Sequence, residues 1–139
     1  MSLSPSAFAL LGLVAWSVLL ILLLVNQRGL LVMSGRMKVN AFAADGSNTP
    51  GAFGQRLVRA HANCVENVPL FAAVLLYAMA TGQTLLTDPL APILLAARIA
   101  QSAVHLISTS ALAVWIRFAA FFVQLLILIW WLLRLASLV

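Results

Sequence analysis

The sequence predicts an all-α integral membrane protein, a four-helix transmembrane bundle that forms one domain over residues 1–139. The first observation is composition: 64% of the residues are hydrophobic and only 8% are charged, against about 25% charged in soluble domains. The second is that the apolar residues gather into four segments of roughly the length that a membrane span requires. The third is the small basic excess, a net charge of +5. On so apolar a chain it indicates membrane topology and buried sites, and no nucleic-acid partner.

Four transmembrane helices are expected, at about residues 6–27, 52–81, 90–108 and 112–138. The first is expected to be a membrane span because it lacks the positive n-region of a cleaved signal peptide and its apolar run is longer than the usual h-region. The second contains a polar stretch from Arg56 to Asn67, followed by an apolar run of only 13 residues. Since a span needs roughly 20 residues, the polar stretch must form part of it.

Turn-forming residues predict the connections. The glycine-rich segment 28–51 is expected to be the one long loop. Thr49-Pro50 predicts the start of the second helix, and Thr87-Asp88-Pro89 predicts that of the third in a similar way. Residues 108–110 predict a tight turn. The long loop holds most of the basic residues outside the spans, so it is expected in the cytoplasm, with both termini outside. In a bacterium this multi-pass protein would lie in the inner membrane.

Polar side chains inside the spans fall on narrow faces when each helix turns by about 100° per residue. A polar face at membrane depth is tolerated only against protein or a water-filled cavity. The sequence therefore predicts a polar site shared by three helices. The three stripes are Arg59, Asn63 and Glu66; Arg98, Gln101 and His105; and Arg117, Phe121 and Gln124.

The charges on these stripes do not balance. Arg59, Arg98 and Arg117 face one carboxylate, that of Glu66, and Arg36 near the end of the first helix is expected to add a fourth cation. Buried positive charge in excess is costly, and a bound anion lowers that cost. The pattern favours a small polyanion that enters from the cytoplasmic side, because arginine binds carboxylates through two parallel hydrogen bonds.

Structural roles compete with this interpretation. Glu66 could form an ion pair with Arg59 or Arg98 that only holds helices together, and Asn67, Ser102 and Gln124 are typical of polar contacts between membrane helices. His61 lies on another face and is expected to anchor the helix. Cys64, the single cysteine, is expected to be a small packing residue. The sequence contains no metal-ligand spacing, glycine-rich phosphate loop or serine–histidine–acid set.

Residues 59–71, RAHANCVENVPLF, resemble the signature of the MAPEG family, the membrane-associated proteins in eicosanoid and glutathione metabolism. The family pattern is Arg-Ala-His-x-Asn-x-x-Glu followed by a proline and an aromatic residue. Arg98, Arg117 and the segment 36–42 match more weakly and support it. The resemblance covers essentially the whole chain, and within the family the chain looks like a microsomal glutathione transferase.

The resemblance implies a homotrimer that binds glutathione between subunits near the cytoplasmic side and uses it as co-substrate. The implied reaction is transfer of glutathione to lipophilic small molecules in the lipid bilayer, or reduction of lipid hydroperoxides. Arg117 is the implied catalytic residue, which stabilises the glutathione thiolate. The residues implied to contact glutathione are Arg36, Arg59, Asn63, Glu66, Arg98, Gln101 and His105.

The chain departs from the family pattern at four positions, and one of them is Ala62, where some members have a basic residue. Gln101 and His105 stand where many members have a histidine and a tyrosine, and Phe121 stands where a tyrosine is common. A MAPEG-fold protein that binds another thiol, an anion or a lipid without transferase activity is therefore the alternative. A small multidrug transporter is the third class, and the absence of an acidic residue from residues 6–27 weighs against it.

Overall fold

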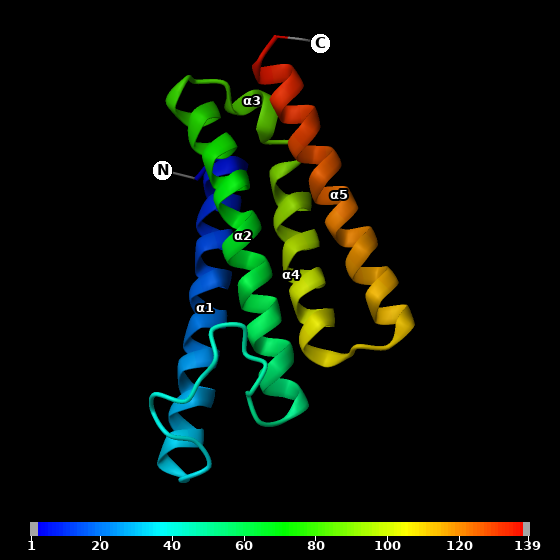
Figure 1. Cartoon of the computed structure of the whole chain (residues 1–139). Helices are drawn as coiled ribbons and strands as arrows, with labels where there is room; N and C mark the ends of the chain where they lie inside the picture. Colours follow the sequence, from blue (N-terminus) through cyan, green and yellow to red (C-terminus); the bar gives the residue numbers. More distant parts are fainter. Residues whose placement is uncertain (1–2, 138–139) are drawn as a thin grey trace.

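The computed structural model describes residues 3–137 and contains only helices and loops over that range (Figure 1). The all-α prediction is confirmed for these residues. Their helices are α1 (Pro5–Met33), α2 (Ala52–Ala80), α3 (Thr84–Thr87), α4 (Ala91–Ile107) and α5 (Ala111–Leu135).

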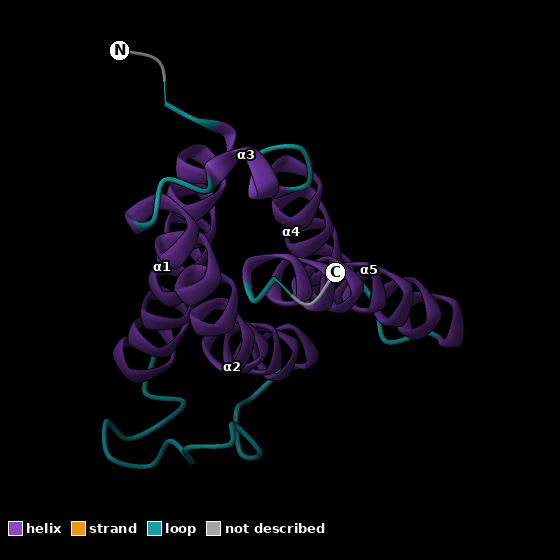
Figure 2. Cartoon of the chain, turned by 90° about the horizontal axis from the view of Figure 1, so that it is seen from above, coloured by secondary structure: helices purple, strands orange, loops and turns teal. Residues whose placement is uncertain are grey.

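The four long helices run alternately up and down, and the single turn of α3 connects α2 to α4 (Figure 1). The shortest of the four, α4, packs against α1, α2 and α5. In both views α5 leans outward, so that α2 and α5 converge near α3 and diverge at the opposite end (Figures 1 and 2). That opposite end carries the long loop, residues 34–51, and the α4–α5 turn, and is called the loop end below.

Three of the described helices, α1, α2 and α5, are long and apolar enough to cross a membrane. The fourth, α4, is apolar but has 17 residues. At about 1.5 Å per residue it reaches roughly 25 Å, a little less than the hydrocarbon core of about 30 Å. The single turn of α3 precedes it at the same end (Figure 1). A fourth span through α4 therefore remains a prediction.

Several predicted boundaries are wrong. Helix α1 continues through Gly29 to Met33, because one glycine costs a helix only about 1 kcal/mol relative to alanine and the flanking residues are apolar. Gly51, with a φ of 83°, is the N-cap residue of α2, and the Thr49 side chain is buried instead. The α4–α5 turn is as predicted, with Ser110 capping α5 by accepting a hydrogen bond from the N–H of Ala113.

The start of the third long helix also differs from the prediction. Thr87 is the last residue of α3, and α4 begins at Ala91 with proline in its first turn. The Asp88 carboxylate caps a different helix: it accepts hydrogen bonds from the N–H of Ser6 at 2.9 Å and from the Ser6 hydroxyl at 2.6 Å. The Ser6 and Thr87 hydroxyls also lie 2.6 Å apart. These contacts tie the first turn of α1 to α3, because a helix N-terminus has unpaired N–H groups and favours negative charge.

The core is a continuous apolar cluster contributed by every long helix and filled at its centre by fully buried side chains. Such side chains stabilise the bundle through close packing, since lipid is as apolar as they are. Among its members are Leu13, Leu20, Leu57, Leu75, Leu94 and Trp131.

We expect Asp88→Ala to lower the stability of the bundle, because it leaves the Ser6 N–H without its acceptor at a buried helix end. Hydrogen bonds to a charged group contribute about 1.5–3 kcal/mol. The check is the thermal midpoint in detergent, followed by circular dichroism. Asp45→Ala is the matched control, because Asp45 is exposed in the long loop and its loss should leave the midpoint nearly unchanged. Equal midpoints for the two variants would contradict this account.

Candidate functional site

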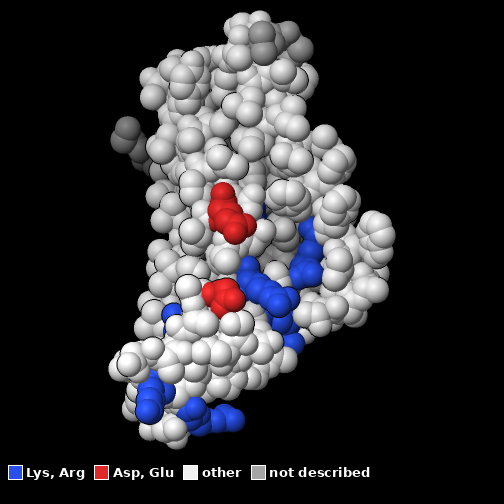
Figure 3. Space-filling model, viewed as in Figure 1, with Lys and Arg blue, Asp and Glu red and all other residues white. Residues whose placement is uncertain are grey.

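Charged side chains gather toward the loop end of the molecule. On the face drawn in Figure 3, the basic side chains lie around a hollow in the lower part, two acidic groups lie beside them, and the uppermost part is uncharged. An uncharged surface matches a hydrocarbon environment, whereas arginines need water, headgroups or a ligand. The uncharged part of this face therefore suits contact with lipid.

Arg98 of α4 is wholly buried inside the single protomer, with 0% of its surface exposed. Its Nη1 donates a 2.6 Å hydrogen bond to the Oδ1 of Asn63 on α2. The guanidinium carbon also lies 5.3 Å from the centre of the Phe71 ring, in a cation–π contact. The structure thus brings together the first two polar stripes, those on α2 and α4, at Asn63 and Arg98. It pairs Arg98 with an amide where sequence analysis considered Glu66.

The rest of the Arg98 guanidinium is under-satisfied. Among the residues that the structure describes, its Nε and Nη2 have no hydrogen-bond partner. A charged group of this kind is costly to bury, and such residues in membrane helices are functional candidates by default. The nearby Ser102 hydroxyl does not bind the guanidinium. It donates to the backbone carbonyl oxygen of Arg98 at 3.0 Å and lies 3.5 Å from the buried Cys64 sulfur.

The Gln101 side chain forms a hydrogen bond between α4 and α5. Its Oε1 accepts a 2.9 Å hydrogen bond from the Nε2 of Gln124 on α5, and both side chains are buried. The same Nε2 donates to the Ala120 carbonyl oxygen at 2.8 Å. This matches the structural role that the sequence suggested for Gln124, and it extends that role to Gln101.

A basic cluster surrounds His105 at the end of α4. His105 lies within electrostatic range of Arg117 on α5 and of Arg59 and Arg56 on α2. His105 and Arg117 are half-buried, while Arg59 and Glu66 are exposed in the single protomer. The second, third and fourth long helices each contribute a basic side chain or His105 to this region.

Arg56 has a role that sequence analysis missed. Its Nε donates a 2.8 Å hydrogen bond to the Leu106 carbonyl oxygen, in the last turn of α4. The last carbonyls of a helix have no partner within it and attract positive charge. Arg56 thereby ties α2 to the end of α4. Nothing in the spacing around Arg56 could have pointed to Leu106, because the two residues are brought together only by packing.

Arg36 lies apart from this cluster within one protomer. It is exposed on the long loop and lines a cavity of about 440 Å³ between the end of α1 and the start of α2. A second, polar cavity of about 410 Å³ lies between the long loop and α2, with Asp45, Gln55 and Arg59 in its wall. The Ser47 N–H donates to the Asp45 carboxylate and lowers the pKa of that group.

The loop reaches α2 through a glycine. Gly46 is buried, has a φ of +71°, and a Cβ there would lie 2.5 Å from the Val58 side chain. Only glycine adopts this conformation freely and allows so close an approach. The polar cavity therefore has a defined wall, with Arg59 at its edge.

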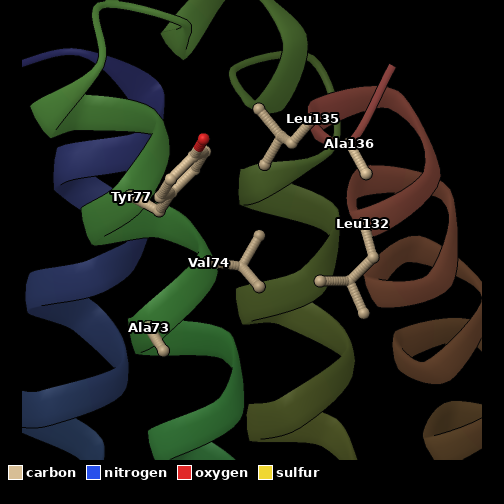
Figure 4. A pocket seen from close by; sticks show the side chains of 6 residues that line it. All are labelled: Ala73, Val74, Tyr77, Leu132, Leu135 and Ala136. Carbon is tan, nitrogen blue, oxygen red and sulfur yellow. The ribbon is translucent and has the colours of Figure 1, made fainter. Parts of the chain in front are cut away.

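An apolar cleft of about 300 Å³ lies at the opposite end of the bundle, where α2 and α5 converge. Figure 4 shows Ala73, Val74 and Tyr77 on α2 across from Leu132 and Leu135 on α5 and from Ala136, which follows α5. It is separated from Arg59 by some four turns of α2, about 20 Å at 1.5 Å per residue. A substrate held there would be remote from the basic cluster.

A family model described as the MAPEG family matches residues 6–137. The chain belongs to the MAPEG family. No curated protein and no solved structure matches it. Its three long apolar helices and its membership of this family make the protein an integral membrane protein.

This MAPEG protein holds no candidate metal centre within residues 3–137, where no three histidine, cysteine, aspartate or glutamate side chains group together. The chemistry available at the loop end is instead that of fixed cations. Guanidinium groups bind carboxylates and lower the pKa of a neighbouring thiol. MAPEG proteins are generally associated with glutathione, which offers both groups.

We expect Arg56→Gln to destabilise the bundle by about 1–2 kcal/mol, since the Leu106 carbonyl loses a charge-assisted donor at a helix C-terminus. Thermal unfolding in detergent would measure the loss. Lys38→Gln is the control, because Lys38 is exposed on the long loop. An Arg56→Gln midpoint equal to that of the control would show that the Arg56–Leu106 contact contributes nothing.

Proposed function

We propose that this MAPEG protein is a glutathione-dependent transferase or peroxidase that acts, as a homotrimer, on lipophilic electrophiles in the bilayer. The observation that carries the proposal is the group of basic side chains around a hollow toward the loop end (Figure 3), where Arg56 reaches the last turn of α4 beside His105. Arg56 and Arg117 are half-buried there, and guanidinium groups that are partly shielded from water favour an anionic partner. Glutathione supplies two carboxylates and, when activated, a thiolate, which suits that charge.

The proposed ligand contacts follow the exposed side chains of the cluster. Arg59 and Asn63 would hold the glutathione carboxylates, and the carboxylate of Glu66 would accept hydrogen bonds from its amine. Arg36 is too remote to join these residues within one protomer, so we propose that it comes from a neighbouring copy. An interface between copies would also remove water from Arg59 and Glu66, which strengthens their interactions with a charged ligand.

Arg117 is the proposed catalytic residue. A free thiol has a pKa of about 8.5, and a fixed cation beside the sulfur lowers it. The thiol proton passes to water, the sulfur forms a bond to the electrophilic carbon, and the leaving group departs with the electron pair. With a hydroperoxide, the sulfur attacks the O–O bond and releases an alcohol; a second glutathione then yields the disulfide and water.

The surface beside Arg117 supports a lipophilic co-substrate. Trp115, Phe118 and Phe122 form an exposed aromatic row on α5, with ring centres 6.0 and 6.2 Å apart along it. Aromatic side chains offer large apolar contact area without a need for water. An electrophile dissolved in the bilayer could therefore approach the sulfur along α5 without entering the aqueous phase.

Calorimetric titration in detergent tests the proposal. We expect saturable glutathione binding by the wild type, and at least tenfold weaker binding by Glu66→Ala, because hydrogen bonds between charged groups contribute about 1.5–3 kcal/mol. Arg134→Ala, at the far end of α5, is the matched control and should bind as the wild type does. Absence of saturable binding by the wild type would refute glutathione as the ligand.

The rate of conjugation to a chlorodinitrobenzene electrophile tests Arg117 separately. In Arg117→Ala the pKa of bound thiol should return toward its free value of about 8.5. The thiolate form, and with it the activity, should then require a higher pH than in the wild type. A pH profile that does not move would contradict thiolate stabilisation by Arg117.

A second function is favoured by one specific observation. The Gln101 amide oxygen is engaged by Gln124, which leaves only the Gln101 Nε2 as a donor, and Phe121 offers no hydroxyl, so neither position offers a sulfur a hydroxyl or imidazole donor. This favours the same fold binding another thiol, an anion or a lipid headgroup without transferase activity. Native mass spectrometry of gently extracted protein separates the two functions: a co-purifying ligand other than glutathione supports the second, and glutathione supports the first.

A further inference from the structure

Arg98 is buried more deeply than a ligand between protomers could reach. Its side chain has no exposed surface in the single protomer, so a molecule bound on the outside of α2 and α4 would not touch it without rearranging the bundle. Asn63, its hydrogen-bond partner, is only half-buried. Arg98 therefore lies behind Asn63, and Asn63 lies between Arg98 and the surface.

The contact determines which way the Asn63 amide faces. A guanidinium has only donors, so the Asn63 atom 2.6 Å from Arg98 Nη1 must be the oxygen. The amide nitrogen, with its two donors, is then directed away from Arg98. Asn63 lies on the same face of α2 as the exposed Arg59 and Glu66, four residues after one and three before the other. Its nitrogen consequently belongs to the face that an anion would meet.

We propose that Arg98 is a positioning residue that locks the Asn63 amide with its nitrogen toward the ligand, as a donor to an anionic group. The inference rests on the proposed function only in naming that group as a glutathione carboxylate. Without Arg98 the amide could turn and present its oxygen, which repels a carboxylate. Arg98 thus acts on the ligand through Asn63 and not by contact.

The surroundings of Arg98 suit this role. The Phe71 ring lies under the guanidinium at 5.3 Å, and Phe71 is itself buried. A planar guanidinium held on an aromatic ring has little freedom to rotate, whereas a lysine ammonium has no plane to fix. A fixed donor holds the orientation of its acceptor, so an Arg98→Lys side chain would keep the charge and lose the lock.

Asn63→Asp is the sharpest test in binding. The carboxylate keeps an acceptor for Arg98, so the thermal midpoint should be unchanged or higher. The outward donor is replaced by an acceptor, so glutathione binding should weaken at least tenfold in calorimetry. Retained or tighter binding would overturn the proposal, because it would mean that Asn63 accepts a hydrogen bond from the ligand.

A double-mutant cycle separates positioning from contact. Arg98→Lys alone should weaken binding, but added to Asn63→Asp it should change the affinity less than twofold, since the donor that it orients is already gone. Independent, additive losses would mean that Arg98 reaches the ligand by itself and would overturn the proposal. Arg134→Lys, a substitution of an exposed arginine, is the control. It should leave the glutathione affinity unchanged both in the wild type and in Asn63→Asp.

The orientation can also be measured without any ligand. The chain has five asparagines, so ¹⁵N-asparagine labelling gives few side-chain amide signals, and Asn63→Ser identifies the one of interest. We expect this signal to be sharp and slowly exchanging in the wild type and broadened in Arg98→Lys. An unchanged signal would overturn the proposal. If the wild type binds no glutathione, the proposed function fails while this measurement still decides the role of Arg98.

Discussion

The burial of the Arg98 guanidinium is the constraint on which the arrangement of the helices depends. A charge without exposed surface is tolerated only with partners, and the partners here are the Asn63 oxygen and the Phe71 ring, both on α2. These contacts fix the register of α4 against α2 in the middle of the bundle. Once this register is fixed, the positions of the other α4 side chains relative to α2 are fixed too, from Leu94 to His105 in the last turn.

The two ends of the molecule are stabilised by different means. At the α3 end, Asp88 accepts hydrogen bonds from Ser6 and holds the start of α1. At the loop end, Arg56 holds the last turn of α4 through the Leu106 carbonyl. Each contact satisfies backbone groups that a helix end leaves unpaired, which matters more in lipid than in water because lipid offers no replacement.

The basic cluster is where stability and the proposed function conflict. Arg56 reaches the last turn of α4 beside His105, basic side chains gather around a hollow toward this end (Figure 3), and like charges repel one another more strongly where water is partly excluded. A bound anionic ligand would offset that repulsion. The free energy of binding would then include the loss of repulsion between the arginines as well as the contacts with the ligand. The hollow among the basic side chains (Figure 3) would offer such a ligand room.

The sequence by itself determined the all-α membrane class, the polar stripes and the family, because composition, helical periodicity and the motif at residues 59–71 are local properties. It also indicated that Arg98 and Gln124 face protein. Only the tertiary structure decided which groups the polar side chains contact. These pairs are Arg98 with Asn63, Gln124 with Gln101, Arg56 with Leu106 and Asp88 with Ser6. The physical reason is that a helical stripe gives the direction of a side chain relative to its own helix axis. The rotation and register of neighbouring helices, which decide what it meets, come from packing of the whole bundle.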